Sequence, residues 1–362
     1  MRLPPRSQVL VLSRIAILGF LLVLLLVLGL RPAGAVEFAR CDVREGWTRI
    51  TTIAPPYDPS GNLAERYWWY ASIAEVGEEG PVLYAAPTFV GLARSDFCGR
   101  HWSGPLFQDP RVSLPGFDWR INWFVDSARL VVVESGGRLH VVISGTRLNT
   151  TSDDAARTWR PTGRVIEPGI PESSAATLEA VGFSRTVPGR GYARVGARAG
   201  RVPGLFAHTD DGIHWHVIRP GLRAGSTTRL LVDPDSDIVY GFYQTTLHRL
   251  IYRNGVTQTD EVATFDSEIT ATALSVDGSR FFAATAQHGL FQSPDRGVTW
   301  TPVAGPAEVG YWMGESNQRA QADAARLGFW RGLEVSRFDP PVLYGISGDG
   351  DFWIYREPSP AP

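Results

Sequence analysis

The chain has 362 residues, of which 44% are apolar and 20% are charged, a composition that excludes a disordered or low-complexity protein. Its 35 basic residues are all arginine, and 37 acidic residues nearly balance them, which gives a net charge of −2. Because nucleic-acid-binding proteins carry a clustered basic excess, we expect no nucleic-acid partner. The sequence also predicts no cofactor.

Residues 1–35 have the three parts of a secretory signal peptide. Arginines open the segment, an uncharged run of sixteen residues extends from Ile15 to Leu30, and Ala33-Gly34-Ala35 forms a cleavage site. As a helix the run spans about 24 Å, less than the ~30 Å hydrocarbon core of a bilayer. We therefore predict cleavage after Ala35 and a secreted or periplasmic, extracytoplasmic protein. The alternative is an uncleaved signal that anchors the chain to the membrane.

Two cysteines, Cys41 and Cys98, follow the predicted cleavage site. Lone cysteines without C-x-x-C spacing are poorly suited to metal binding, and an exported compartment permits them to pair. The sequence thus predicts a disulfide between Cys41 and Cys98. Loss of the signal would remove four arginines and no acid, which changes the net charge from −2 to −6.

Short segments that end in tryptophan recur along the chain and share the pattern S-x-D-x-G-x-T-W. Residues 293–300 match it throughout, and three further copies match in part. The tryptophans are 57, 56 and 85 residues apart, and a degenerate copy at residues 247–255 occupies the longest interval. The residues assigned to the pattern are Ser95, Asp96, Gly99 and Trp102; Ser152, Asp154 and Trp159; Asp210, Gly212 and Trp215; and Ser293, Asp295, Gly297 and Trp300.

The residue types in this pattern are those of a tight turn. Ser and Asp side chains accept hydrogen bonds from turn amides, Gly adopts positive φ, and Trp covers the apolar gap beside the turn. The pattern resembles the Asp-box, or BNR, repeat of sialidase-like β-propellers. That resemblance implies a structural role for Asp154, Asp210 and Asp295, on the face opposite the usual ligand site.

Apolar, β-branched runs of strand length lie upstream of these copies and are bounded by turn residues. We distinguish six similar units, which begin near residues 67, 121, 178, 228, 269 and 333. The sixth unit lacks a fourth strand, whereas residues 46–50 look like the strand that follows a copy of the pattern. We predict an all-β, six-bladed β-propeller, a single domain over residues 36–362, closed by this N-terminal strand in the last blade. Seven blades are the alternative, if part of residues 37–67 forms its own sheet.

One connection is too long for a simple crossover between blades. Residues 316–327 within it have the character of a short helix, so we predict a helical insertion near residues 305–332. The aromatic residues Tyr311, Trp312 and Trp330 are candidates for partner binding. The alternative is that they anchor the insertion onto the blades.

Charged residues of the predicted loops supply further candidates. Arg198, Arg201 and Arg223 belong to a local positive set, which favours an acidic surface on a partner protein. Asp118, Glu167 and Asp266 are candidates for the carboxylate pair of a glycoside hydrolase. The early F/Y-R-I-P motif of sialidases is absent, since the nearest string, residues 119–122, lacks the proline. His214 and His216 alternate around a tryptophan of the pattern, and we assign no metal site to them.

We therefore expect an exported, non-catalytic β-propeller that binds an envelope protein or glycan, or assists assembly. The resemblance extends to exported propellers like the photosystem II assembly factors and to glycosidase-like propellers. The alternative is a glycoside hydrolase or glycan-binding, sialidase-like protein of the cell envelope.

Overall fold

The computed structural model describes part of the chain. The described residues are 43–53, 71–76, 81–87, 92–95, 98–103, 129–136, 138–144, 150–152, 158, 160–161, 165–166, 176–197, 205–218, 230–235, 238–253, 256–306, 330–337, 341–347 and 350–358. The chain divides into two compact units, Met1–Val43 and Arg44–Pro362, and the strands of the described residues belong to the second. Regular structure in these ranges is all strand, so they contain no helix able to cross a membrane.

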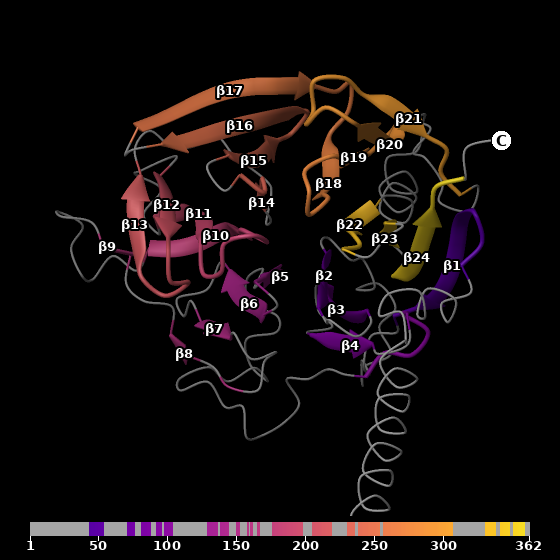
Figure 1. Ribbon diagram of the computed structural model, residues 1–362, viewed down its shortest axis with the longest axis horizontal. Coiled ribbons are helices and arrows are strands. Elements are labelled where there is room, and N and C mark those ends of the chain that lie inside the picture. The colour runs from indigo at the N-terminus through magenta and orange to yellow at the C-terminus, as the bar shows by residue number, and fades with distance from the viewer. Residues whose placement is uncertain are drawn as a thin grey trace, which may run out of the picture. The chain divides into compact units, whose positions relative to one another are not determined.

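The described strands form six sheets, shown in chain order from indigo to yellow in Figure 1. The first sheet contains β2 (Ala71–Val76), β3 (Val82–Pro87) and β4 (Ala93–Ser95). The second contains β5 (Arg129–Ser135), β6 (Arg138–Ser144), β7 (Thr150–Ser152) and β8 (Arg160–Pro161). The third contains β10 (Ala176–Phe183), β11 (Gly191–Ala197), β12 (Leu205–Thr209), β13 (Trp215–Ile218) and β9 (Val165–Ile166).

The other three sheets each have four strands. The fourth contains β14 (Leu231–Val232), β15 (Ile238–Tyr243), β16 (Thr246–Arg253) and β17 (Val256–Thr264). The fifth contains β18 (Ile269–Leu274), β19 (Phe281–Thr285), β20 (Gly289–Ser293) and β21 (Thr301–Val303). The sixth contains β22 (Trp330–Val335), β23 (Val342–Ser347), β24 (Asp351–Arg356) and β1 (Gly46–Thr52).

The first strands of the sheets contact one another in a closed order. β2 contacts β5, and contacts continue through β10, β14, β18 and β22 back to β2. Neighbouring strands within each sheet are antiparallel, except that β9 joins the edge strand β13 in parallel. Sheets of antiparallel strands repeated around a centre make a β-propeller, which confirms the predicted all-β propeller architecture.

The closing strand is also confirmed. β1 pairs antiparallel with β24, from Gly46 opposite Arg356 to Thr52 opposite Asp351. A side-chain ion pair supports this pairing, because Arg49 Nε lies 2.7 Å from Asp351 Oδ2. The N-terminal strand therefore supplies the fourth strand of the sixth sheet and covers an edge that would otherwise be unpaired.

Apolar side chains fill the interfaces between neighbouring sheets. The first strands are buried on both faces, as β18 (Ile269–Leu274) and β22 (Trp330–Val335) illustrate, because each packs against the sheets on either side. One interface packs Trp330, Leu333 and Trp353 against Phe282 and Leu290. Since burial of each large side chain contributes about 1.5–3 kcal/mol, these interfaces hold the sheets together.

Trp330 is therefore a core residue, and its prediction as a partner contact is wrong. Its side chain is 2% exposed and stacks on Trp47 of β1, with ring centroids 4.5 Å apart. Gly345 of β23 leaves space for the ring, because a Cβ there would lie 2.3 Å from it. β22 begins at Trp330, so the last three residues of the predicted insertion are strand. Tyr311 and Trp312 lie outside the described residues.

Replacing Gly99 with alanine is expected to destabilise the protein by about 2–5 kcal/mol. Its φ of +77° costs an L-residue about 1–2 kcal/mol, and a Cβ would lie 2.2 Å from the ring of Phe352, where overpacking typically costs about 1–3 kcal/mol. Gly46 is the matched control, because its φ is +85° but nothing lies within 4 Å of a Cβ. In urea unfolding, Gly46→Ala should lower the free energy of unfolding only by the cost of backbone strain, about 1–2 kcal/mol. Equal losses in the two variants would show that the contact with Phe352 does not restrict residue 99.

Candidate functional site

The antiparallel strands place successive turns at opposite ends of each sheet. Residues 184–190, 210–214, 233–235, 275–280 and 294–300 lie at one end, which we call the turn face. Contacts join them: Arg190 Nε lies 3.1 Å from Asp210 Oδ1, and Arg296 Nη1 lies 2.8 Å from Asp235 Oδ2. Residues 244–245, 265–268 and 286–288 lie at the other end, which we call the connection face. They are joined by backbone hydrogen bonds from Phe265 to Thr245 and from Ala286 to Glu268.

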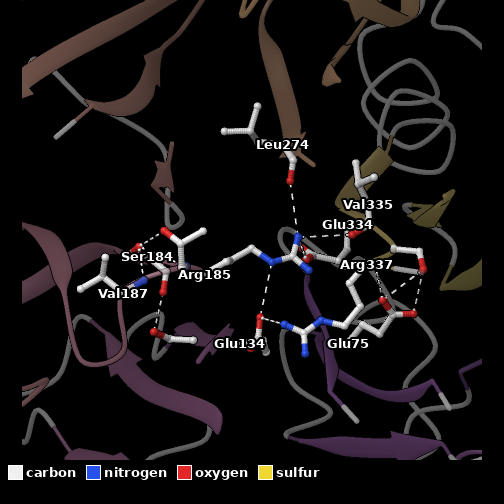
Figure 2. Close-up of polar contacts among 12 residues, drawn as sticks. Glu75, Glu134, Ser184, Arg185, Val187, Leu274, Glu334, Val335 and Arg337 are labelled. Atoms are coloured by element: carbon white, nitrogen blue, oxygen red, sulfur yellow. Dashed lines mark hydrogen bonds and ion pairs between the residues drawn. The ribbon is translucent and has the colours of Figure 1, made fainter. Parts of the chain in front are cut away.

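A buried ionic cluster joins the first strands near the turn face (Figure 2). Its centre is Arg185, which follows β10 and is 9% exposed. Arg185 Nη1 lies 3.1 Å from Glu334 Oε1, and Arg185 Nε lies 3.5 Å from Glu134 Oε2. Arg185 Nη1 also donates to the carbonyl oxygens of Leu274 and Val335, at 3.5 and 3.3 Å. The contacts of Arg185 thus reach the second, fifth and sixth sheets from the third.

These contacts cross the centre of the closed order of strands. β10 and β22 are separated by two first strands in either direction, so they lie opposite each other. A side chain that extends from the end of β10 to Glu334 and Val335 of β22 therefore occupies the middle. Arg185 closes the centre of the propeller at this end.

A second part of the cluster surrounds Glu75 of β2. Its carboxylate accepts hydrogen bonds from Tyr344 Oη at 2.5 Å and from the amide of Arg337 at 2.7 Å. The hydroxyl of Ser336 donates to both carboxylate oxygens at 3.1 Å. Burial raises the pKa of Glu75 despite these donors, because the charged form is desolvated.

The guanidinium of Arg337 connects the two parts, since its Nη2 lies 2.7 Å from Glu134 Oε2. Glu75, Glu134 and Glu334 are 0%, 1% and 2% exposed. Each carboxylate is held by a guanidinium or by hydroxyl and amide donors and is shielded from solvent. General acid–base catalysis needs a carboxyl group within hydrogen-bond reach of a substrate, so this geometry is structural.

Tyr344 and Glu75 have the side-chain types of a sialidase nucleophile pair, but their surroundings oppose that chemistry. Tyr344 is 1% exposed. Burial and the adjacent Glu75 carboxylate raise the pKa of Tyr344 well above its usual value. A phenol that is harder to ionise and closed to substrate is a poor nucleophile.

The turn at residues 293–300 has the hydrogen bonds that its sequence predicts. Ser293 Oγ accepts the amide of Gly297 at 2.7 Å and donates to Asp295 Oδ1 at 2.8 Å. Asp295 accepts the amide of Thr299 at 2.8 Å and its hydroxyl at 2.6 Å. These bonds from Thr299 lower the pKa of Asp295 to about 2.

The turn before Trp215 uses a different aspartate from the one assigned by sequence. Asp211, and not Asp210, accepts the amides of Ile213 and His214, both at 2.8 Å. Thr209 takes the place of the serine, since its hydroxyl accepts the amide of Gly212 at 3.0 Å. The turn is one residue shorter than the turn at 293–300, so an alignment without gaps selects the wrong acid.

Asp210 instead binds His208 and Arg190, at 3.2 and 3.1 Å. His214 Nδ1 lies 2.6 Å from Asp211 Oδ2. His216 of β13 pairs instead with His208 of β12. Among the described residues no group of three or more His, Cys, Asp or Glu side chains is arranged to hold a metal ion.

Replacing Asp295 with asparagine is expected to lower Tm by about 2 °C at pH 7, because the turn loses an ionised acceptor. The folded pKa of about 2 lies below the usual 3.8, so this stabilisation is complete above pH 4 and is lost as the pH falls toward 2. Calorimetry from pH 7 to pH 2.5 should therefore show the Tm difference shrinking. Glu261→Gln, at an exposed position of β17, is the control. A difference that does not change with pH would contradict the assigned role of the carboxylate.

The connection face carries exposed side chains that make no polar contact within the part of the chain that the structure describes. Tyr243 is 43% exposed, and five polar residues beside it are exposed as well. Within the described part of the chain, these side chains form no hydrogen bond or ion pair. We call this set the connection patch: Tyr243, Gln244, Asp266, Glu268, Gln287 and His288.

Only part of the sequence-based site can be located. Asp266 is exposed in the connection patch, whereas Asp118 and Glu167 lie outside the described residues, as do Arg198, Arg201 and Arg223. Gly99 donates its amide to Ser95 Oγ at 3.0 Å, as predicted for a turn of this type. Cys98 is disulfide-bonded. The other predicted residues outside the described ranges are Cys41, Asp96, Asp154 and Trp159.

The ionic cluster and most of the connection patch were not predicted from the sequence. A signal for the cluster is present, since Glu75, Glu134 and Glu334 are each the penultimate residue of a first strand. Tyr243 and Gln287 have no comparable signal, because exposed polar residues in turns are common.

No family model and no curated protein matches the chain. A protein of unknown function from Bacteroides thetaiotaomicron is similar in structure, with a TM-score of 0.54 and 11% identity over 86% of this chain and 76% of that one. YCF48 from Cyanidioschyzon merolae aligns with a TM-score of 0.47 and 11% identity, over 86% of this chain and 98% of that chain. A GH74 enzyme from Niastella koreensis aligns with a TM-score of 0.44 and 13% identity, over 80% of this chain.

This chain spans 37% of the length of the GH74 enzyme. At 11% identity, the likeness to the Bacteroides thetaiotaomicron protein shows a shared fold alone. The class of protein defined by the fold is thus the β-propeller.

Proposed function

We propose that this chain is an exported, non-catalytic β-propeller of the Asp-box type, with one blade for each of its six sheets, and that it binds an envelope protein through its connection face. Three observations support the six blades: six sheets, a closed order of first strands, and a last sheet completed by β1. The Ser293, Asp295 and Thr299 contacts support the Asp-box assignment.

The proposal that the connection face binds a partner rests on a difference between the two faces in how their acidic side chains are paired. On the turn face, aspartates form hydrogen bonds or ion pairs within the chain: Asp211 with His214, Asp235 with Arg296, and Asp277 with Ser275 and Ser279. On the connection face Asp266 and Glu268 are exposed, and no described residue pairs with them. Exposed groups without an internal role, on a rigid scaffold, are typical of a binding surface.

The buried cluster supports a scaffold without catalysis. Its carboxylates are closed to substrate: Glu334 and Glu134 pair with Arg185 and Arg337, and Glu75 is held by hydroxyl and amide donors. These contacts join sheets that are far apart in sequence, so they stiffen the propeller on which the connection face is built. A rigid surface binds with a smaller entropy cost than a flexible one.

Photocrosslinking from the two faces tests this function. The structure offers a matched pair, because Tyr243 and Val298 are exposed large apolar side chains of the described residues and lie on the connection face and the turn face respectively. Each is replaced with p-benzoylphenylalanine in the full chain, which is expressed in its host and irradiated with solubilised envelope. We expect a saturable protein adduct from position 243 and none from position 298.

Two results would overturn the proposal. Equal adducts from positions 243 and 298 would show nonspecific contact with both faces. Release of reducing sugar from envelope glycans by the purified chain would favour the alternative, a glycoside hydrolase, and Asp118, Glu167 and Asp266 would then be the first residues to replace.

A further inference from the structure

The connection between β17 and β18 holds two acids in fixed positions. Phe265 anchors its start, with its ring packed on Phe291 and Trp300 at centroid distances of 5.4 and 5.2 Å. Ser267 anchors its middle, because it is buried and its hydroxyl accepts the amide of Gln287 at 3.2 Å. Asp266 and Glu268, on either side of Ser267, are consequently held on the surface.

The neighbouring turns are joined to this connection by backbone hydrogen bonds. The carbonyl oxygen of Gln244 accepts the amide of Ile269 at 2.8 Å, and Gln244 has a left-handed φ of +52°. The carbonyl oxygen of Glu268 accepts the amide of Ala286 at 2.8 Å. The connection patch is therefore one surface that spans the fourth and fifth sheets, and its shape is set by main-chain bonds.

The two carboxylates have no counter-ion in the described part of the chain. Three arginines of the same two sheets are engaged elsewhere: Arg249 with Asp260, Arg296 with Asp235, and Arg280 with Glu357. Two exposed carboxylates on one short connection give this face a local negative charge, which attracts a cation of another molecule. The aromatic ring of Tyr243 on the same face is a surface on which a guanidinium can stack.

On the basis of the proposed function, we infer that the partner presents an arginine-bearing peptide segment to the connection patch. Arginine matches the patch better than lysine, because its planar guanidinium forms two parallel hydrogen bonds to a carboxylate and stacks on tyrosine. The side-chain amides of Gln244 and Gln287 can bond the main chain of the same segment. The net negative charge of the chain adds a long-range attraction for a basic segment, which salt would screen.

Two labelled hexapeptides test the chemistry of this site. One is Gly-Arg-Gly-Arg-Gly-Gly, and the other has citrulline, which is neutral and nearly the same shape, at both arginines. Fluorescence anisotropy with the full chain should show binding of the arginine peptide that weakens at least tenfold between about 50 and 300 mM salt. The citrulline peptide should bind at least tenfold more weakly.

Variants locate the binding on the patch. Asp266→Asn with Glu268→Gln should reduce affinity for the arginine peptide about tenfold. Glu261→Gln, an exposed acid on β17 outside the patch, should leave it unchanged. Equal binding of both peptides, or equal loss in Glu261→Gln, would overturn the inference, because the interaction would then be nonspecific or a response to net charge.

Crosslinking from position 243 separates this inference from the function on which it rests. In the Asp266→Asn, Glu268→Gln background, we expect the adduct to be lost. An undiminished adduct that is insensitive to salt would overturn the arginine segment and leave the protein-binding function intact. No adduct in either background would overturn the binding function itself.

Discussion

Replacing Arg185 with methionine is expected to lower the free energy of unfolding by about 3–5 kcal/mol, the usual cost of breaking a buried ion pair from one side. Methionine keeps an apolar stem but removes the positive charge, so Glu334 and Glu134 lose the guanidinium that lies 3.1 and 3.5 Å away. Both carboxylates remain buried, and Glu134 keeps its contact with Arg337 Nη2 at 2.7 Å, so the cost falls mainly on Glu334. Urea unfolding at pH 7, followed by tryptophan fluorescence, measures the change.

Arg190→Met is the matched control for this prediction. Arg190 is on the same turn and pairs with Asp210, but the two side chains are 34% and 63% exposed, so the loss should be below about 1 kcal/mol. Adding Glu334→Leu to Arg185→Met should recover part of the stability, because the buried carboxylate that paired most closely with Arg185 is removed as well. Equal small losses for Arg185 and Arg190 would mean that apolar packing alone holds the sheets together.

Trp330→Ala is expected to destabilise the protein by about 3–5 kcal/mol, as for other buried aromatic residues. The indole packs between Trp47 of β1 and Trp353 of β24, with centroid distances of 4.5 and 6.5 Å. Its loss would leave a cavity where the closing strand meets the sixth sheet. The same urea titration measures it, and hydrogen exchange of β1 amides should accelerate.

Trp47→Ala tests the other ring of the Trp47–Trp330 stack. Trp47 is less buried and donates from Nε1 to the carbonyl oxygen of Ala304 at 2.8 Å, so we expect a smaller loss of about 1–3 kcal/mol. Because the rings touch, the double variant should lose less than the two single losses added together. Strict additivity would contradict the stacking as a source of stability.

The repeated turns and the closing strand could be predicted because their signals are local. The residues at 293–300 specify their own hydrogen bonds, and residues 46–50 resemble the strand that a turn of this kind precedes. The role of Asp211 was assigned to Asp210 because the prediction relied on local residue spacing alone. A one-residue shortening leaves the residue types intact while moving the acid, and only the hydrogen bonds of Thr209 and Asp211 reveal it.

The ionic cluster and the connection patch could not be predicted in the same way. Glu75, Glu134, Arg185 and Glu334 come from four sheets, and their meeting depends on where each first strand ends relative to the centre. The patch likewise depends on backbone bonds between turns that are distant in sequence, such as those of Thr245 and Glu268.

The sequence by itself determined the strand units, the turn chemistry and the means of closure, because each follows from side chains that act on their own backbone or on the next strand. Only the tertiary structure decided that Trp330 is buried, that Arg185 closes the centre, and that Asp266 and Glu268 have no counter-ion among the residues that the structure describes. Burial and ion pairing depend on distances between sheets, and those distances are set when all the sheets pack together.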